Sequence, residues 1–516
     1  GIRLPVTDEE DSEPWTAPAS GGRKEPAVTG PLPEQLHLVL GNQVYIPKEG
    51  LDPSLRNRFI RLAAFQNPEF YRAEAMRLST YGKPRVISCC EEFPKHLALP
   101  RGCLDQALEL LASLQVRAEV TDERFAGTPI DVQFHGTLRP EQLRAAEALL
   151  RHDTGVLAAS TAFGKTVIGA YLIAQRRVNT LVIVHRRQLL DQWIGALSNF
   201  LGLESDSVGQ IGGGKHKPTT RLDVAMIQSL SDKGTVSEII GEYGQLIVDE
   251  CHHISAVSFE RVVRQSKARY VTGLSATVVR RDGHHPVIFM QCGPLRFRVA
   301  DRKHAGSRPF RHRVIVRLTG FHVPEGLKDM TSHHIHELYS MLAVDEDRNR
   351  MIVEDVVAAI QARRSPLLLT ERRDHLETLV GMLAPLVENV IVMTGGMRKR
   401  QRDSLAEKLA SVSPSQERVI VATGRYLGEG FDDSRLDTLF LALPISWRGT
   451  LTQYAGRLHR LHADKQDVIV FDYVDSEVRV LAGMYAKRRK GYKAIGYEID
   501  LPGEGGKPAQ FALENL

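Results

Sequence analysis

The stretch ASTAFGKT, residues Ala159 to Thr166, decides the fold class of this chain. It follows an apolar run typical of a strand and opens a helical pattern. In such an arrangement the backbone N–H groups of the loop and of the helix N-terminus bind phosphate oxygens, the lysine reaches the β- and γ-phosphates, and the hydroxyl binds magnesium. The segment therefore predicts a phosphate-binding loop with contacts from Ala162, Phe163, Gly164, Lys165 and Thr166.

Two adjacent carboxylates supply the other half of this chemistry. Asp249 and Glu250 directly follow the apolar run from Leu246 to Val248, which predicts a buried strand. Open α/β sheets bind their ligands beyond the carboxyl ends of the strands. We therefore expect Asp249 and Thr166 to hold Mg²⁺, and Glu250 to orient or deprotonate the attacking water.

The loop departs from the usual G-x-x-x-x-G-K-[ST] pattern, because Ala159 stands at the first glycine. Taken alone, Gly164-Lys165-Thr166 is as consistent with a helix start that carries a solvated lysine. The carboxylate pair at a strand end favours the phosphate-binding interpretation.

Length and composition limit the class of protein. A chain of 516 residues is too long for one ordinary core, so we expect about three domains with flexible ends. No apolar stretch approaches the roughly 20 residues of a membrane span, and no signal peptide begins the chain, which predicts a cytoplasmic protein without a membrane partner. The net charge of +5 permits a polyanionic partner without requiring one.

Beyond His135, apolar runs alternate with amphipathic helices, and the alternation repeats after about residue 310. This pattern is typical of parallel sheets with helices on both faces, and predicts two α/β lobes in tandem. The expected segments are a disordered acidic linker over 1–33, a small auxiliary α/β domain over 34–134, a first lobe over 135–305, a second lobe over 306–478, and a basic helical extension and tail over 479–516.

Several polar motifs fall at the expected ends of strands. The amide of Gln142, at the first helix of the first lobe, has the paired donor and acceptor that an adenine edge requires, although such a residue is more often a solvated helix start. Cationic, amide and hydroxyl groups suited to phosphate contacts occur at Arg186, Gln188, Gln228 and Ser229, and each singly is as consistent with a solvated turn. The hydroxyls of Ser275 and Thr277 can link the nucleotide site to a bound strand.

Two further motifs lie in the second lobe. One is Gly428 to Asp432, with candidate nucleotide contacts at Gly430 and Asp432. The other places Gln453, Arg457 and Arg460 on one helical face, an arrangement that is costly to bury unless it faces an anion. Near the C-terminus, the run Lys487 to Lys490 lies among tyrosines and suits either a nucleic-acid contact or a solvated helix face, with the second favoured.

In this order, the motifs make the chain resemble a superfamily 2 helicase over nearly all of residues 135–475. The shared elements are ASTAFGKT, the DECH box, the SAT element, the T-G…E-G-x-D element and Q-x-x-G-R-x-x-R. LRPEQ, DECHH and LSATVVRRDG are most similar to the repair-helicase branch and to restriction-enzyme motor subunits. In that family Ala162 is usually glycine, and Arg280-Arg281-Asp282 replaces the Arg-Glu-Asp of the repair branch, so a role in duplex wedging is in doubt there.

The resemblance implies a P-loop NTPase with two RecA-like lobes that hydrolyses ATP with Mg²⁺ in the cleft between them. Arg457 and Arg460 would neutralise the γ-phosphate. The implied nucleic-acid contacts are Arg186, Gln188, Gln228 and Ser229 in the first lobe and Thr394, Gly395 and Thr423 in the second. The resemblance favours DNA over RNA, and a role in defence or repair.

A narrower resemblance is to the helicase portion of bacterial primase-helicase polypeptides of TOTE-type conflict systems. It rests on stretches such as RLAAFQNPEFYRAEAMRLST and implies a primase domain before Gly1. Two alternatives stay open at this point. The chain could be an ATP-gated module that only grips nucleic acid, or a motor subunit that translocates on duplex without unwinding it for a partner nuclease or primase.

Overall fold

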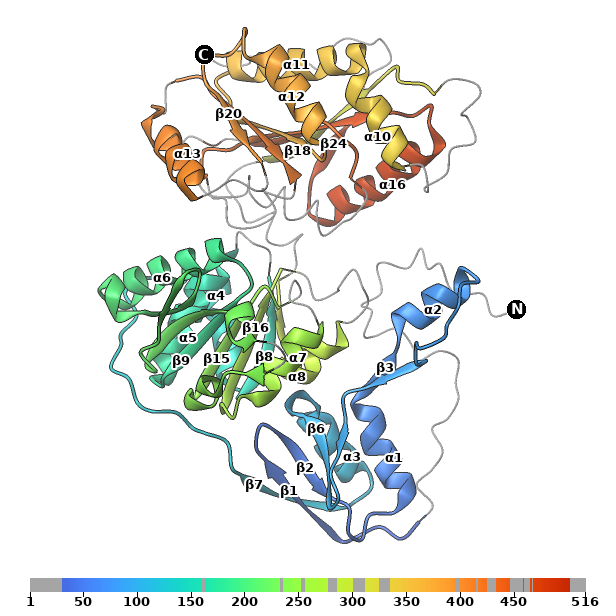
Figure 1. The fold of residues 1–516 in the computed structure, drawn as a ribbon, viewed down its shortest axis with the longest axis vertical. Coiled ribbons are helices and arrows are strands. Elements are labelled where there is room, and N and C mark those ends of the chain that lie inside the picture. The colour runs from blue at the N-terminus through green and yellow to red at the C-terminus, as the bar shows by residue number, and fades with distance from the viewer. Residues whose placement is uncertain are drawn as a thin grey trace. The chain divides into compact units, whose positions relative to one another are not determined.

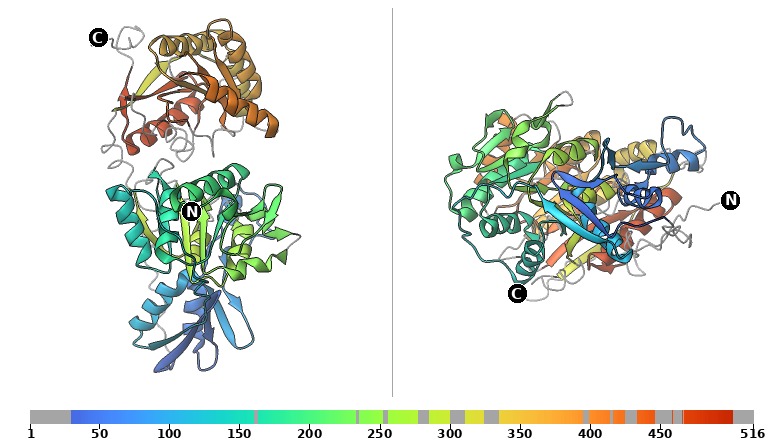
Figure 2. Two further views of the ribbon diagram at one scale, coloured as in Figure 1. Left: turned by 90° about the vertical axis from the view of Figure 1, so that its left-hand side faces the viewer. Right: turned by 90° about the horizontal axis from the view of Figure 1, so that it is seen from below.

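The computed structural model describes residues 30–501 except for short internal segments. These are 160–162, 233–234, 252–255, 277–284, 300–310, 324–334, 395–398, 414–415, 425–432, 446–457, 459–464 and 466. The chain divides into two compact units, one of Gly1–Ala158 and Thr166–Arg298, the other of Val299–Leu516 and Ala159–Lys165. Figures 1 and 2 show helices on both faces of the main sheet in each unit.

The auxiliary domain is a mixed five-stranded sheet covered by two helices. Only β1 and β7 run parallel. The strand order is β5 (Glu91–Glu92), β6 (His96–Pro100), β2 (Gln43–Pro47), β1 (Gln35–Leu40) and β7 (Arg117–Asp122). The covering helices are α1 (Pro53–Leu62) and α3 (Leu104–Ser113). A hairpin of β3 (Ala64–Gln66) and β4 (Val86–Ser88) carries α2 (Pro68–Ala75).

The first lobe is an eight-stranded sheet in which every strand except β11 is parallel to its neighbours. Its order is β11 (Lys215–Lys217), β10 (Gly209–Gly212), β12 (Leu222–Met226), β9 (Thr180–Val184), β15 (Gln245–Asp249), β16 (Tyr270–Ser275), β8 (Thr154–Ala158) and β17 (Leu295–Arg298). The helices are α4 (Pro140–Leu150), α5 (Lys165–Arg176), α6 (Arg187–Leu201), α7 (Ala256–Gln265) and α8 (Pro286–Cys292). A small hairpin joins β13 (Ser231–Asp232) to β14 (Thr235–Val236).

Period-two burial explains why both faces of this sheet are covered. Val156 and Leu246 point to the face under α7 and α8, whereas Leu157 and Ile247 point to the other face, and all four are fully buried. Figure 1 shows α4, α5 and α6 on that other face. The core under α7 and α8 continues without a break into the auxiliary domain.

A buried arginine joins the auxiliary domain to the first lobe. Arg101, just before α3, donates from Nη1 to the carbonyl oxygen of Ala268 at 3.1 Å and from Nη2 to those of Asn42 at 3.1 Å, Val263 at 3.2 Å and Ser266 at 2.5 Å. A Cβ added to Gly102 would lie 1.9 Å from the carbonyl oxygen of Phe289, so only glycine fits there. The two parts therefore touch through backbone as well as side chains.

The segment after β7 runs along the first lobe as an extended strap (Figure 1). Phe125 bridges to Ala268, and Pro129 bridges to Val178. The buried Asn179 holds the strap, because its Oδ1 accepts from the backbone N–H of Thr128 at 2.9 Å and its Nδ2 donates to Glu242 O at 2.6 Å. The strap thus contacts the segments that precede β9 and β16, and Asn179 links it to the segment that precedes β15.

The second lobe is a seven-stranded sheet, parallel throughout its described pairings. Its order is β20 (Val390–Met393), β21 (Val419–Thr423), β19 (Pro366–Thr370), β22 (Thr438–Leu441), β23 (Asp467–Val474), β18 (Arg311–Leu318) and β24 (Glu498–Asp500). Helices α11 (Glu346–Gln361) and α12 (Arg373–Leu383) share one core with it. On the other face lie α13 (Lys399–Ser411) and α16 (Arg479–Ala494), and α10 (Ile335–Val344) packs beside α11 and α12.

Helix α16 corrects one expectation from the sequence. Arg488 is 3% exposed and forms a two-pronged ion pair with Asp472, with both shorter contacts at 2.8 Å. Tyr492 is fully buried and donates to the same carboxylate at 2.9 Å. These two side chains hold α16 against β23 of the second lobe, so they are not exposed for a nucleic-acid strand. Within the described chain, no helix has the length and apolar character needed to cross a membrane.

A buried histidine in the second lobe predicts acid sensitivity. His375 is fully buried, its Nδ1 lies 3.0 Å from Thr370 Oγ1, and its Nε2 lies 2.8 Å from Asn349 Oδ1. Asn349 donates from Nδ2 to Ala343 O, so its Oδ1 must accept the Nε2–H of a neutral imidazole. Burial, and secondarily Arg348, lower the pKa of His375 to about 3.

Because the folded pKa of His375 lies below its unfolded value of about 6.5, its contribution to stability is complete above that pH and is lost as the pH falls. We expect the free energy of unfolding of the second lobe to fall by about 1.4 kcal/mol per pH unit between roughly pH 6 and pH 4 from this group. Denaturant unfolding across this range measures the slope. The His375→Gln variant should lack this component, and equal slopes in the two proteins would contradict the assignment.

Candidate active site

The phosphate-binding loop begins where β8 ends and closes where α5 starts. Gly164 has φ of 90°, a conformation that favours glycine, and it directly precedes the helix. Lys165 is 5% exposed and donates from Nζ to Ala159 O at 3.1 Å, so its ammonium group turns back over the loop. Phe163 is fully buried and Thr166 is half-buried. Ala162 lies outside the described residues.

Asp249 is the last residue of β15, which lies between β9 and β16 in the sheet. It is 4% exposed, its Oδ1 accepts from the backbone N–H of Glu250 at 2.9 Å, and its Oδ2 accepts from Trp193 Nε1 at 2.7 Å. Two hydrogen bonds to N–H donors favour the ionised carboxylate. The arrangement therefore provides an oriented anionic oxygen ligand of the kind that Mg²⁺ prefers.

Trp193 also sets the spacing between two helices. A Cβ added to Gly169 of α5 would lie 2.5 Å from the indole ring of Trp193 on α6. The sequence shows Trp193 only as one member of the apolar face of α6, with Leu189, Leu190 and Leu197. Its role in holding Asp249 was missed because sequence spacing does not reveal which acceptor a buried indole N–H will meet.

Glu250 is connected directly to the SAT element. It has φ of 47°, a left-handed conformation that is uncommon for glutamate, and is 8% exposed. Its Oε2 accepts from the backbone N–H of Ala276 at 3.2 Å. Because Ser275 ends β16 beside Asp249, one strand pair brings the DECH box and the SAT element together. Thr277 lies beyond the described part of the chain.

Gln142 lies at the start of α4, as expected, and is 5% exposed. Its Oε1 accepts from the backbone N–H of Arg139 at 2.9 Å, which forms part of a capping box. The amide oxygen therefore serves the helix start, and contact with adenine stays a prediction.

The proposed strand contacts of the first lobe gather at the ends of neighbouring strands. Arg186 and Gln188 follow β9, while Gln228 and Ser229 follow β12, which pairs with β9. Gln228 donates from Nε2 to His185 O at 3.0 Å, so the two motifs touch. Arg186, Gln228 and Ser229 are exposed. The geometry thus forms a polar edge with a cation and side-chain donors facing solvent.

Two of the second-lobe candidates are also neighbours. Thr423 ends β21, and Thr394 follows β20 directly beyond the Met393–Ala422 pair, so both lie at one edge of the second sheet. The remaining second-lobe candidates fall outside the described residues and keep the status of predictions: Gly395, Gly430, Asp432, Gln453, Arg457 and Arg460.

Comparison with known proteins finds relatives among helicases and translocases. The family described as the res subunit of type III restriction enzymes matches residues 135–280. Probable helicase D10 of Escherichia phage T5 is 25% identical over 400 residues, which cover 75% of this chain and 83% of that protein. The DNA 3'-5' translocase XPB2 of Sulfurisphaera tokodaii is 23% identical over 369 residues, covering 64% and 80%. L396 of Acanthamoeba polyphaga mimivirus, provisionally named an ATP-dependent RNA helicase, is 25% identical over 386 residues, covering 72% and 70%.

The phosphate-binding loop, the paired carboxylates and the two parallel sheets define a nucleoside triphosphatase with tandem RecA-like lobes. These relatives are helicases and a translocase, and the similarity indicates that the chain is a nucleic-acid-dependent ATPase of the superfamily 2 helicase type.

The contact between Trp193 and Asp249 predicts a specific loss of turnover. Trp193→Phe removes the N–H donor but keeps most of the packing, so Oδ2 of Asp249 loses this hydrogen bond. We expect the free energy of unfolding to fall by about 1 to 3 kcal/mol, and kcat for ATP hydrolysis to fall about tenfold, as for a loss of about 1.4 kcal/mol in the barrier. Phe259→Leu, which trims a buried ring on the opposite face, is the control for stability. Equal kcat values in the two variants would show that Trp193 has no role in ATP hydrolysis beyond its contribution to stability.

Proposed function

We propose that this chain is an ATP-driven motor that moves along DNA, and that Asp249 and Glu250 are the centre of its hydrolytic site. The observation that supports this most directly is the position of the two carboxylates at the end of a buried strand, one held by Trp193 and the other by the SAT backbone. A change in the bound nucleotide can thus affect the SAT element, which lies in the same sheet as the polar edge formed by Arg186, Gln228 and Ser229.

The described residues fit ATP and Mg²⁺. Gly164 and the N-terminus of α5 offer backbone N–H groups, and Lys165 offers a charge within the loop. Thr166 and Asp249 supply oxygen ligands for the metal, and Glu250 is the general base or the group that orients water. When bound, Mg²⁺·ATP supplies the phosphoryl group whose hydrolysis drives the motor.

The link from Glu250 to Ala276 suggests how the nucleotide state is transmitted. A carboxylate that accepts a hydrogen bond from the SAT backbone cannot change position without affecting that bond. We propose that Ser275 and Thr277 respond to this change and pass it to the strand contacts. These contacts comprise Arg186, Gln188, Gln228 and Ser229 of the first lobe and Thr394, Gly395 and Thr423 of the second.

DNA is the proposed track because two relatives, XPB2 of Sulfurisphaera tokodaii and XPB of Kineococcus radiotolerans, are named for action on DNA. The mimivirus relative is named for RNA, so the polymer is part of the test. We further propose a cytoplasmic role in bacterial defence or repair, with a primase or nuclease as partner. This part rests on the resemblance of the sequence to TOTE-type primase-helicases.

Steady-state ATP hydrolysis tests the proposal. The wild-type chain should be stimulated by DNA at least about tenfold over its basal rate, and Glu250→Gln should abolish turnover because it removes the group that activates water. Single-stranded DNA, duplex DNA and RNA are compared at equal nucleotide concentration, and the polymer that stimulates identifies the track. Turnover in wild type that none of the polymers increases would overturn the motor assignment and favour an ATP-gated binding module.

A separate unwinding assay divides a helicase from a duplex translocase. Release of a labelled strand from a tailed duplex indicates unwinding, whereas displacement of a bound protein roadblock without strand release indicates translocation on intact duplex. The second result would favour the motor-subunit alternative, which the restriction-enzyme family match supports.

The two arginines of the second lobe give a further prediction. We propose that Arg457 and Arg460 place positive charge on the γ-phosphate during hydrolysis. Arg460→Ala should therefore lower kcat about 10³-fold or more while nucleotide binding changes little. Arg479→Ala, at an exposed position at the start of α16, is the charge-matched control. Wild-type turnover by Arg460→Ala would show that the arginine has no such role.

A further inference from the structure

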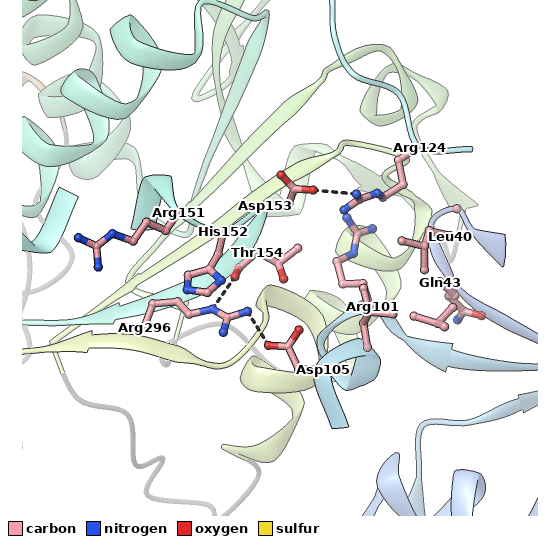
Figure 3. A pocket seen from close by; sticks show the side chains of 13 residues that line it. Leu40, Gln43, Arg101, Asp105, Arg124, Arg151, His152, Asp153, Thr154 and Arg296 are labelled. Carbon is pink, nitrogen blue, oxygen red and sulfur yellow. Dashed lines mark hydrogen bonds and ion pairs between the residues drawn. The ribbon is translucent and has the colours of Figure 1, made fainter. Parts of the chain in front are cut away.

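A cavity of about 250 Å³ lies between the auxiliary domain and the first lobe (Figure 3). One wall comes from β1, β2 and the start of α3, and the other from the turn after α4, the start of β8 and β17. A single water needs about 10 to 15 Å³ by the same measure, so the cavity has room for a small molecule. The residues on which the argument depends are Gln43, Arg101, Asp105, Arg124, Asp153 and Arg296.

The walls carry more positive than negative charge. Four arginines and His152 line the cavity, against only two carboxylates, Asp105 and Asp153. Arg124 donates to Asp153 at 2.8 Å, and Arg296 donates from Nη2 to Asp105 at 2.7 Å (Figure 3). Both carboxylates of the cavity wall are therefore paired with an arginine, and the other positive charges of the wall have no carboxylate partner within it.

Arg101 is a buried cation of the cavity wall without a carboxylate partner in its hydrogen bonds. It is 6% exposed and donates only to backbone carbonyl oxygens within the described chain. Among the described residues, its Nε has no hydrogen-bond partner, and neither has Oε1 of Gln43, which is 2% exposed. Buried polar atoms are satisfied in most folded proteins, so two such atoms beside one cavity point to a polar occupant.

The pKa values of two residues in the cavity wall, Arg101 and His152, agree with an excess of positive charge. Burial lowers the pKa of Arg101 to about 10, and the nearby Arg124 acts in the same direction. Burial, followed by the charge of Arg296, lowers the pKa of His152. An anion in the cavity would relieve this repulsion between cations.

We propose that the cavity binds a phosphate-type oxyanion, either free phosphate or the phosphoryl group of a nucleotide. Guanidinium groups match the tetrahedral oxygens of phosphate through paired N–H donors. Arg296 has Nη1 without a hydrogen bond to another described residue, and Arg101 offers Nε.

This site is distinct from the ATP site. Thr154, at the amino end of β8, lines the cavity, whereas the phosphate-binding loop follows Ala158 at the carboxyl end of the same strand. Five strand residues span about 13 to 16 Å. The inference does not depend on the proposed motor function, because it concerns binding to a different end of the first lobe.

Isothermal titration calorimetry of the full chain with sodium phosphate, at constant ionic strength, tests the proposal. All proteins carry Lys165→Ala, which removes the lysine of the phosphate-binding loop and so weakens phosphate binding at that loop. The background protein should show saturable binding. Asp105→Asn should tighten it about three- to fivefold, because it removes an opposing charge that is partly exposed. Arg296→Met should weaken binding about tenfold.

Glu109→Gln is the matched control, since it neutralises an exposed acid one turn further along α3 and outside the cavity. It should bind phosphate as the background protein does. A gain of affinity in Asp105→Asn alone cannot arise from misfolding. Repeating the series with AMP identifies the source of the phosphoryl group. If the variants show the same order of affinities for AMP and bind it more tightly than phosphate, the ligand is a nucleotide. If that order is seen with phosphate only, the ligand is the free ion. The absence of saturable binding for both, or equal affinities for Asp105→Asn and Glu109→Gln, would overturn the proposal.

Discussion

The hydrogen bond from Trp193 to Asp249 is the interaction on which the catalytic half of the molecule depends. A carboxylate at the end of a central buried strand is unstable unless its charge is satisfied, and the indole N–H and the backbone N–H of Glu250 do this. The same indole ring fits against Gly169, so Trp193, which holds the candidate metal ligand Asp249, also sets how closely α5, with Lys165 at its start, packs against α6.

Much of the fold could be predicted from residue patterns, because buried parallel strands are continuous apolar runs. Thr180–Val184 and Gln245–Asp249 are clear examples. Two strands near the margins of the first sheet, β10 and the edge strand β17, could not be predicted in this way. Gly209–Gly212 is short and contains two glycines, and Leu295–Arg298 alternates with arginines, so neither has the composition of a buried strand.

The candidate catalytic residues could be named from the sequence because phosphate chemistry requires particular side chains at fixed spacing. Their supports were not, since a hydrogen bond between residues 56 positions apart depends on tertiary packing. Arg488 shows the reverse error. Its charge and position in a basic run suggested a solvent-exposed face, but the helical period turns it toward Asp472 and the core.

The core shared between the auxiliary domain and the first lobe has a consequence for how this protein can vary. Arg101 and Gly102 are fitted against backbone atoms of the lobe, and one apolar cluster continues through both parts. A boundary drawn in the sequence before His135 would cut through this cluster and expose the apolar surface that α7 and α8 present to the auxiliary domain. The auxiliary domain is therefore not an interchangeable module, and a different domain could replace it only if it reproduced this contact surface.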